Sequence, residues 1–365
     1  MPRPLLAAVL GALAVVGLTG CGGGDGSSAA DPSSSGSGGM STAAAFLSTY
    51  VTDDGRVLRH DQGDDVVSEG QAYGMLVAEL AGQPDVVRSI WAWTRDHLVR
   101  EDGLLAYHAS SDGNVLDNQA ASDADALAAY ALLRYEGDQA AELHADGRAL
   151  ASAVLEHETA PDPSGGPVLV AGPWAVGPPA VVNPSYWMPS VFDDLAQLTG
   201  DDRWSAMASA SVDLLDRLSG GGRQLPPDWA TLRGDSLEPS GPGGGGEPAQ
   251  YGPDAQRVPL WLAASCDARA ATLESAWWKI LQQDNRSAAL ALSLDGSPVD
   301  GSAFAVALLA AGAAARASGD DAAAVDLETG ARQTDEGTPG YYGAAWLALA
   351  EGLRDGRLTG RCTGG

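Results

Sequence analysis

The chain has 365 residues, and its 21 Lys and Arg against 48 Asp and Glu give a formal net charge of −27. So acidic a chain repels nucleic acid and acidic polysaccharides, and we expect a neutral or cationic partner. The charge has a plainer explanation as well, because a high net charge keeps an exported protein in solution.

Residues 1–20 have the pattern of a secretory signal peptide, with Arg3 ahead of an apolar stretch that runs from Leu5 to Leu18. The stretch is short for a membrane span, and no stop-transfer pattern follows it. A lipobox-like motif at Leu18-Thr19-Gly20-Cys21 predicts cleavage and lipid attachment at Cys21, with an ordinary cleavage and an unmodified cysteine as the alternative. In residues 21–40 we expect this cysteine and a flexible tether, because Gly, Ser, Asp, Ala and Pro dominate there.

Residues 41–365 contain no second linker of this kind, and we expect one large domain. Short apolar runs at 168–170 and 290–294 are weak strand signals. Elsewhere, about a dozen helices joined by Gly- and Pro-rich loops predict an all-α architecture of stacked helix pairs, because each amphipathic helix must bury its apolar side. The predicted helices cover residues 41–52, 68–82, 85–100, 122–136, 139–157, 185–199, 202–219, 254–265, 269–283, 301–316, 319–328 and 341–355.

The first candidate for chemistry is a carboxylate at a helix start, in the stretch Ser68-Glu69-Gly70-Gln71-Ala72-Tyr73-Gly74-Met75. Ser68 and Gln71 have the spacing of a capping box, which places Glu69 in the first helical turn. Apolar residues follow at helical spacing, so a rigid element carries this carboxylate. The alternative is that Glu69 only complements the helix dipole.

Two further stretches place acids at helix starts. In Ala121-Ser122-Asp123-Ala124-Asp125, Ser122 is a natural N-cap and both aspartates fall in the first turn, with simple capping chemistry as the alternative. In the other stretch, Asp254 opens a helix and Arg257 lies three residues later on the same face. Arg257 can pair with an acid or orient it there, and the alternative is a surface ion pair of little energetic value.

Aromatic residues stand in proline-containing segments between these motifs, at Pro173-Trp174, Asn183-Pro184-Ser185-Tyr186-Trp187 and Pro226-Pro227-Asp228-Trp229. Flat aromatic faces commonly hold the C–H faces of sugar rings, which makes these tryptophans candidate sugar platforms. Ordinary packing is the alternative for each, because Trp is highly buried on average.

The two remaining cysteines, Cys266 and Cys362, form a pair in a chain that we expect to be exported, which predicts a disulfide between them. Neither has metal-ligand spacing, and the five histidines are scattered along the chain. We therefore expect no metal site.

Side by side, these stretches resemble glycoside hydrolase family 8, in particular the secreted endo-β-1,4-glucanases that accompany bacterial cellulose synthesis. Residues 68–75 look like the family's general-acid motif, and residues 121–125 are similar to the start of its signature. The similarity runs from about Phe46 to Leu353. It implies an (α/α)6 barrel with a long substrate cleft across one end, and hydrolysis with inversion. Further matches follow in the family's order, at Asn183-Pro184-Ser185-Tyr186, Pro227-Asp228-Trp229, Asp254-Ala255-Gln256-Arg257-Val258-Pro259 and Tyr341-Tyr342-Gly343.

The resemblance implies that Glu69 is the general acid and Asp254 the general base, the carboxyl pair that inverting hydrolysis needs. Here Gly252 and Pro253 stand before Asp254, where the most familiar form of the motif has a tyrosine directly before the aspartate. A helix N-terminus lowers a carboxyl pKa, whereas a general acid must keep its proton. We hypothesise that the Asp123 carboxylate raises the Glu69 pKa and also binds the sugar at the cleavage point.

Other site residues are expected to hold the substrate. Arg257 is expected to orient Asp254, and Tyr186 to lie near the cleavage subsite. Trp174, Trp187 and Trp229 are the expected platforms. Tyr73, Asp125 and Tyr341 complete the substrate-binding set. No cofactor is expected, because two carboxyl groups suffice for this chemistry.

The expected protein is thus a secreted, lipid-anchored endo-β-1,4-glucanase that acts as a monomer on cellulose-like β-1,4-linked polysaccharide. We expect it at the outer face of the cytoplasmic membrane or outside the cell, bound to membrane only by its lipid and without a nucleic-acid partner. The alternatives are the same fold acting on chitosan, xylan or mixed-linkage glucan, and a glycan-binding lipoprotein without catalysis.

Overall fold

The computed structural model describes residues 40–162 and 166–360. The predicted signal peptide, Cys21, nearly all of the tether and Cys362 lie outside these residues. Within the described part, no helix has both the length and the apolar character that crossing a bilayer requires.

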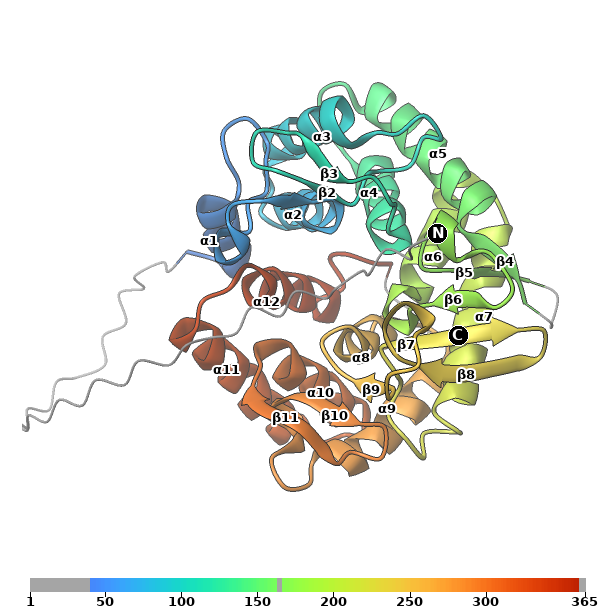
Figure 1. Ribbon diagram of the computed structural model, residues 1–365. Coiled ribbons are helices and arrows are strands. Elements are labelled where there is room, and N and C mark those ends of the chain that lie inside the picture. Colours follow the sequence, from blue (N-terminus) through green and yellow to red (C-terminus); the bar gives the residue numbers. More distant parts are fainter. Residues whose placement is uncertain (1–39, 163–165, 361–365) are drawn as a thin grey trace, which may run out of the picture.

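The described residues form twelve α-helices in two concentric rings (Figure 1). The inner ring consists of α2 (Ser68–Leu80), α4 (Ser122–Arg134), α6 (Pro189–Thr199), α8 (Val258–Leu262), α10 (Ala305–Ala317) and α12 (Tyr341–Arg354). Each inner helix contacts the next, and α12 contacts α2. The ring is therefore closed, and the predicted (α/α)6 barrel is confirmed.

The other helices form the outer ring. They are α1 (Thr42–Tyr50), α3 (Pro84–Leu98), α5 (Ala140–His157), α7 (Arg203–Leu218), α9 (Ala268–Leu281) and α11 (Asp321–Gly337). The helices from α2 to α12 alternate between the rings, and α1 fills the last outer position by packing on α12 and α2. The chain thus builds the barrel from consecutive helix pairs.

Composition decides which ring a helix joins. In α4, every residue from Ser122 to Leu133 is buried, and alanine makes up much of this segment. Small side chains let the inner helices approach one another, and a helix that is apolar all round must be covered on all sides. The outer helix α11 has a charged face, and of its described residues Ala324 and Ala331 are buried. An outer helix needs an apolar stripe on one side only.

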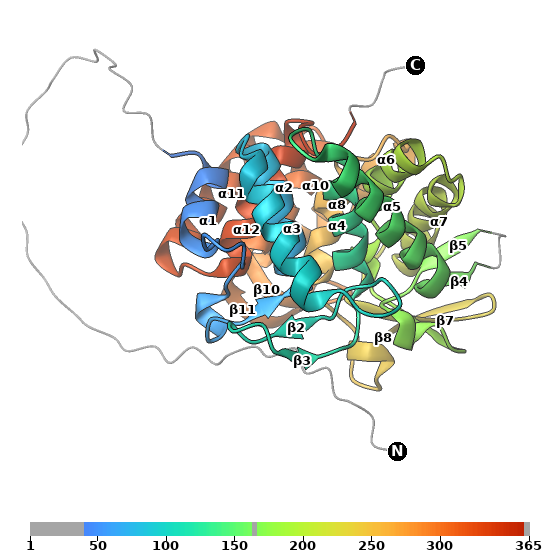
Figure 2. The same ribbon diagram turned by 90° about the horizontal axis from the view of Figure 1, so that it is seen from above.

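Short antiparallel sheets cover one end of the barrel, where the inner helices begin (Figure 2). The strands are β1 (Val66–Val67), β2 (His108–Ala109), β3 (Val115–Asp117), β4 (Thr159–Pro161), β5 (Pro167–Leu169), β6 (Ala180–Val182), β7 (Trp229–Arg233), β8 (Ser236–Ser240), β9 (Gln250–Tyr251), β10 (Ala289–Ser293) and β11 (Pro298–Ala303). They pair as β1-β2-β3, β4-β5, β6-β7-β8 and β9-β10-β11. The two weak strand signals correspond to β5 and β10.

The predicted capping of α2 and α4 is wrong. Val67 precedes α2, and within the described residues the Ser68 hydroxyl has no hydrogen-bond partner. The Gln71 amide turns inward instead, accepting the Val57 N–H at 2.7 Å. Likewise Ala121 precedes α4, and the Ser122 hydroxyl donates to the Val170 carbonyl. Burial explains both cases, because these side chains satisfy loops that cross the helix ends.

The two ends of the described chain lie at the barrel end opposite the sheets (Figure 2). The Thr42 hydroxyl in α1 donates to Glu351 in the last turns of α12 at 2.8 Å. Near the other end of the chain, the Leu358 carbonyl accepts the Tyr130 hydroxyl at 2.5 Å. We call this the closed end, and the end with the sheets the open end.

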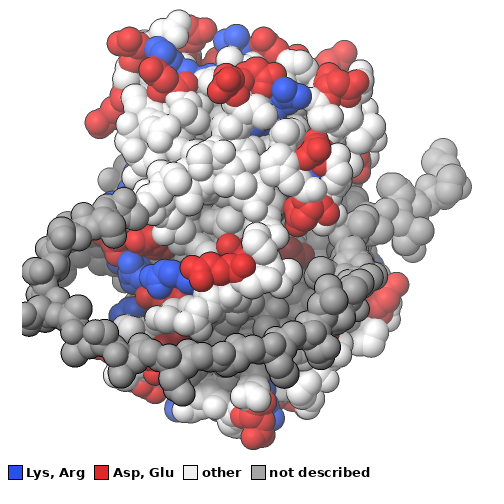
Figure 3. Space-filling model, turned by 90° about the vertical axis from the view of Figure 1, so that its left-hand side faces the viewer, with Lys and Arg blue, Asp and Glu red and all other residues white. Residues whose placement is uncertain are grey.

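Charge is spread thinly on one side of the molecule. Figure 3 shows that acidic side chains on this face lie in small groups, some of them beside basic ones, with uncharged surface between them. In the part of this face that Figure 3 leaves in view, the acidic side chains therefore form no continuous patch despite the strongly negative net charge.

Candidate active site

Arg257 joins the carboxylates that the sequence motifs single out. Its side chain is 2% exposed, and Nη1 donates to Glu69 Oε2 at 2.9 Å and to Asp123 Oδ2 at 3.0 Å. Nη2 donates to Asp254 Oδ1 at 3.0 Å. One planar guanidinium therefore holds acids from distant parts of the chain in a fixed arrangement.

These acids meet because each stands at the start of an inner helix. Glu69 is in the first turn of α2, and Asp123 is in the first turn of α4. Asp254 directly precedes a 3₁₀ helix, Ala255–Arg257, which leads into α8. The positive ends of helices favour carboxylates, and the closed ring brings these ends toward one axis.

Further contacts fix the guanidinium itself. Nη1 lies 3.0 Å from the Tyr73 hydroxyl, and Nη2 lies 2.6 Å from the Ser185 hydroxyl. The guanidinium carbon also lies over the Tyr186 ring, 5.4 Å from its centroid, in a cation–π contact. Arg257 is expected to orient Asp254, and the structure adds its contacts with Glu69 and Asp123.

The environment of Glu69 keeps its proton on near neutral pH. Burial raises the pKa of Glu69 to about 7, the Arg257 charge lowers it, and the Asp123 and Asp254 charges raise it. The hypothesised effect of Asp123 has the expected direction, but burial is the larger cause. The Glu69 side chain remains 20% exposed, so a ligand at the open end can reach it.

The other two acids differ in access to solvent. Asp123 is 2% exposed, and burial raises its pKa against the opposing effects of the Arg257 charge and the Ala124 N–H. Asp254 is 34% exposed, and its Oδ2 accepts the Asn183 side-chain amide at 3.0 Å. Asp254 is thus the acid to which water has the freest access.

Aromatic rings continue the site away from Arg257. Trp229 lies 6.5 Å from Tyr186 and 6.5 Å from Trp174, measured between ring centroids. All three side chains are half-buried. We call Trp174, Tyr186 and Trp229 the aromatic strip. Apolar rings with one open face suit a sugar chain that runs past the acids.

Two expected substrate contacts are wrong. Trp187 is fully buried, and its Nε1 donates to the Leu169 carbonyl at 3.0 Å, so no face is open to a sugar. Asp125 is also fully buried, and its Oδ1 accepts the Leu105 N–H at 2.8 Å. Residues two apart lie on different sides of a helix, which is why Asp125 points away from Asp123 and into the protein.

The two expected tyrosines are buried as well. Tyr73 is fully buried and meets the site only through its hydroxyl on Arg257. Tyr341 is 3% exposed and packs over Gly70, where its hydroxyl would lie 3.0 Å from an added Cβ. Both therefore support the acids from behind. A side chain at Gly70 would press on Tyr341, which accounts for the glycine beside Glu69.

Other residues join the site without having been assigned a role from the sequence. Tyr107 faces the acids, and burial together with the Glu69 charge raises its pKa to about 12. The Tyr342 hydroxyl reaches the Pro253 carbonyl at 3.4 Å. Asp228 and Asn183 contact the segment around Asp254. Asn183, Asp228 and Tyr342 lie inside motifs noted above, so their place in those motifs was the signal available in the sequence. Tyr107 lies outside these motifs.

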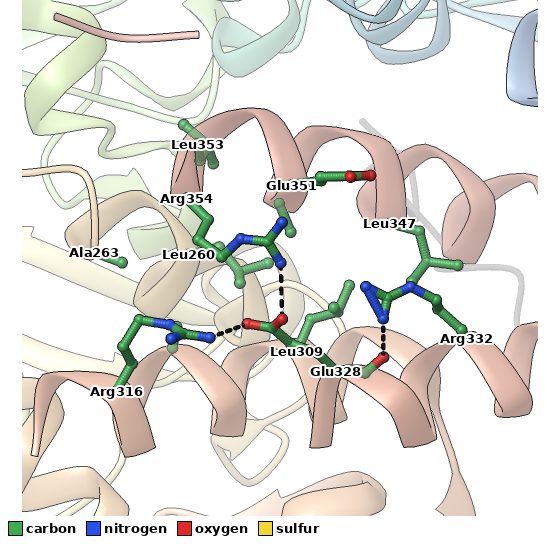
Figure 4. Close-up of a pocket in the computed structure, with 12 residues that line it drawn as sticks. Leu260, Ala263, Leu309, Arg316, Glu328, Arg332, Leu347, Glu351, Leu353 and Arg354 are labelled. Carbon is green, nitrogen blue, oxygen red and sulfur yellow. Dashed lines mark hydrogen bonds and ion pairs between the residues drawn. The ribbon is translucent and has the colours of Figure 1, made fainter. Parts of the chain in front are cut away.

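A separate hollow lies at the closed end, away from the acids. A cavity of about 120 Å³ opens between α10, α11 and α12, and Figure 4 shows Arg316 and Arg354 converging on Glu328 at its wall.

In the described part of the chain, no group of three or more His, Cys, Asp or Glu residues is arranged to hold a metal ion. Cys266 is disulfide-bonded, and its predicted partner Cys362 lies outside the described residues.

The sequence profile of glycosyl hydrolases family 8 matches residues 32–347. The chain belongs to glycosyl hydrolase family 8. The match includes all three acids and Arg257, so the convergence of these residues occurs within the part of the chain that defines the family.

Curated family 8 relatives are similar over part of their length. The protein named "Probable endoglucanase" from Novacetimonas hansenii is 33% identical over 228 residues, which cover 60% of this chain and 65% of that protein. Endoglucanase A of Acetivibrio thermocellus is 30% identical over 181 residues, covering 47% of this chain and 37% of that protein. The chain thus spans less than two thirds of each of these relatives.

A solved structure shares the architecture over nearly its whole length. The endo-beta-1,4-glucanase CMCax from Acetobacter xylinum superposes with a TM-score of 0.70 at 26% identity, covering 86% of this chain and 97% of that chain. The two chains therefore share the barrel architecture.

Proposed function

We propose that this protein is an endo-β-1,4-glucanase that hydrolyses cellulose-like glucan with inversion, with Glu69 as general acid and Asp254 as general base. The observation that carries the proposal is that the Arg257 guanidinium contacts two carboxyl groups that lie in different environments. Glu69 is largely buried with a pKa of about 7, and Asp254 is the most open of the acids. These are the environments that an acid and a base require.

In the proposed reaction, the Glu69 carboxylic acid gives its proton to the glycosidic oxygen as the bond to the anomeric carbon breaks. That oxygen leaves with the bonding electrons. A water molecule held by Asp254 attacks the anomeric carbon from the opposite face and passes its proton to the Asp254 carboxylate. The product has the opposite anomeric configuration, and each acid has changed its protonation state once.

Arg257 and Asp123 keep the two roles apart. Arg257 donates to the Asp254 carboxyl, while burial raises the pKa of Glu69 despite the same arginine. The Asp123 charge adds to this effect, and we propose that Asp123 also contacts the sugar at the cleavage point. A single arginine can thus hold both the proposed base and the proposed acid in place.

The aromatic strip supports cleavage within a polymer. Trp174, Tyr186 and Trp229 extend from the acids toward one side, so a chain longer than the cleaved bond can lie across them. Their half-open faces suit the apolar sides of glucose rings. The two curated relatives described above are named endoglucanases, which agrees with this extended site.

We further propose that the protein is exported and anchored through a lipid on Cys21. The described chain begins at the closed end, where Thr42 contacts Glu351. An anchor before this point would be attached at the end of the barrel opposite the acids and the aromatic strip.

The test is release of reducing sugar from carboxymethyl cellulose, with chitosan, xylan and mixed-linkage glucan assayed in parallel. Glu69→Gln and Asp254→Asn are each expected to lower kcat by about 10²–10⁴-fold, the usual contribution of a general acid or base. Glu79→Gln is the matched control, because burial raises the pKa of Glu79 to about 7 on the same helix at the closed end. If the protein cleaves one of the other polymers faster, that polymer replaces cellulose-like glucan as the proposed substrate. If the folded protein releases no sugar from any of the four polymers, the proposal is contradicted.

A further inference from the structure

The segment that carries Asp254 is a short turn, in which the Gln256 N–H donates to the Gly252 carbonyl at 3.0 Å. It leaves β9 at Tyr251, passes through Gly252 and Pro253, and enters the 3₁₀ helix at Ala255. Proline has no N–H, so Pro253 cannot be tied to the protein by a main-chain donor. The geometry of Asp254 therefore depends on what the residues on either side of it contact.

One side chain bonds both flanks of this turn. Asp228 Oδ1 accepts the Gly252 N–H at 3.0 Å and the Ala255 N–H at 2.8 Å. These donors stand two residues before Asp254 and one residue after it. Asp228 Oδ2 lies 3.3 Å from the side-chain amide of Gln250. The Asp228 carboxylate thus bridges both flanks of the turn, in addition to the turn's own main-chain bond.

Asp228 is itself held rigidly. It is 7% exposed, and its N–H donates to the Gln250 carbonyl at 2.8 Å. The next residue, Trp229, begins β7 and belongs to the aromatic strip. Asp228 therefore connects the strip, which we expect to hold the polymer, with the turn that carries Asp254.

The Asp228 carboxylate lies so close to Gly252 that a side chain has no room there. A Cβ added there would lie 2.5 Å from Asp228 Oδ2 and 3.0 Å from the Gln250 amide nitrogen. Contacts this short would displace the Asp228 carboxylate from the two N–H groups. The glycine beside Pro253 thus leaves the space that the carboxylate occupies.

We infer that Asp228 is a positioning residue for Asp254: by closing the Gly252–Ala255 turn, it sets where the carboxylate stands relative to Glu69. The inference rests on the proposed role of Asp254 as base.

The charge environment agrees with this geometry. Burial and then the Asp254 charge raise the pKa of Asp228 to about 7, while the bonds from the Ala255 and Gly252 N–H groups lower it. Asp228 remains an acceptor in either protonation state. The turn can therefore stay closed across the pH range in which the site works.

The experiment compares Asp228→Ala with Asp228→Asn in the purified protein. Alanine removes the acceptor, whereas asparagine keeps a carbonyl oxygen that can accept both N–H groups. For Asp228→Ala we expect kcat to fall by about 100-fold with little change in KM, because a shift of about 1 Å at a reacting group has that cost. Asparagine is expected to restore most of the lost kcat.

Asp194→Ala is the matched control, since Asp194 accepts the Gly360 N–H at 3.0 Å at the closed end. It removes a similar acceptor without touching the site, and kcat is expected to stay unchanged. Unchanged kcat in Asp228→Ala, a loss confined to KM, or equal losses in the alanine and asparagine variants would each overturn the inference.

Hydrogen exchange separates this inference from the proposed activity. In Asp228→Ala, the Gly252 and Ala255 amides are expected to exchange faster, while the helices keep their protection. Gly252→Ala is expected to give the same exchange pattern with Asp228 in place. If the wild type cuts no polymer, the proposed function fails, but unchanged exchange at these two amides overturns the positioning role by itself.

Discussion

The two ends of the barrel each carry a compact ion cluster, one centred on an arginine and the other on a glutamate. Among the described residues at the open end, Arg257 forms ion pairs with three carboxylates, and its side chain is 2% exposed. At the closed end, Glu328 forms ion pairs with two arginines, Arg316 at 2.6 Å and Arg354 at 2.8 Å (Figure 4). Those arginine side chains are 37% and 33% exposed.

Burial determines what each cluster does. At the closed end Arg316 and Arg354 also pair with Asp321 and Asp355, and water screens these charges, so the cluster can contribute only modestly to stability. At the open end three acids share one arginine, two of these acids and the arginine are largely shielded from water, and the acids cannot all ionise at low cost. A proton on Glu69 removes part of this excess negative charge, and the protonated form is the one that a general acid needs.

Removing Arg257 is expected to have the largest effect. Arg257→Ala leaves the three acids without their cation, and the free energy of unfolding is expected to fall by about 3–5 kcal/mol, the usual cost of breaking a buried pair. Arg257→Lys keeps the charge but loses the planar fork, so stability should recover more than kcat does. Denaturant unfolding and kcat, measured on both variants, make the test. An alanine variant as stable and active as the wild type would contradict the role of this arginine.

Removing one acid is expected to change the pH dependence of the reaction. The activity of the wild type, measured as kcat/KM, should fall as pH rises through about 7, because Glu69 then loses its proton. Asp123→Asn removes a charge that raises the Glu69 pKa, so this alkaline limb should move to lower pH. The pH–rate profile of both proteins gives the comparison, with Glu79→Gln as control. If the alkaline limb of Asp123→Asn stays at the same pH as in the wild type, Asp123 does not influence the Glu69 pKa.

A buried acid just behind the site extends the comparison to stability. Both Glu158 oxygens lack a hydrogen-bond partner within the described residues, and burial followed by the Asp125 charge raises the Glu158 pKa well above its usual value. Its folded pKa exceeds the unfolded one, so this group favours folding at low pH, and that contribution is lost as pH rises toward the folded pKa.

Glu158→Gln, which cannot ionise, is therefore expected to raise the melting temperature near pH 7 and to change it little near pH 4. Thermal unfolding at several pH values makes the measurement. A uniform loss of stability at every pH would show that the carboxyl acts through packing and not through its charge.

The smallest effect is expected at the closed end. Glu328→Gln breaks two ion pairs in the cluster with Arg316 and Arg354, yet both arginines remain partly hydrated. The free energy of unfolding is expected to fall by about 1 kcal/mol or less, with kcat unchanged. A loss as large as that of Arg257→Ala would remove the contrast between the two ends.

The barrel was predictable because its signals are local. Alanine- and leucine-rich segments at helical spacing gave twelve predicted helices, and each overlaps a helix of the structure. The helix starts were less predictable. Ser68 and Ser122 have the right residue types for caps, but within the described residues the Ser68 hydroxyl has no partner, and the Ser122 hydroxyl donates to a loop from elsewhere in the chain.

The site was predictable only as far as its motifs. The pair of Asp254 and Arg257 was visible three residues apart, whereas the contacts of Arg257 with Glu69 and Asp123 depend on closure of the ring. Trp187 and Trp229 have similar proline-containing surroundings, but tertiary packing buries Trp187 and leaves Trp229 half-open.

The most direct test of the acid and base assignment is the anomeric form of the first product. Proton NMR of a cello-oligosaccharide, recorded within the first turnovers and before mutarotation, distinguishes the two anomers of the new reducing end. Our account predicts the α-anomer, because water activated by Asp254 attacks the face opposite the bond that Glu69 protonates. A β-anomer formed first would require a covalent glycosyl–enzyme intermediate, and the roles given to Asp254 and Arg257 would then be contradicted.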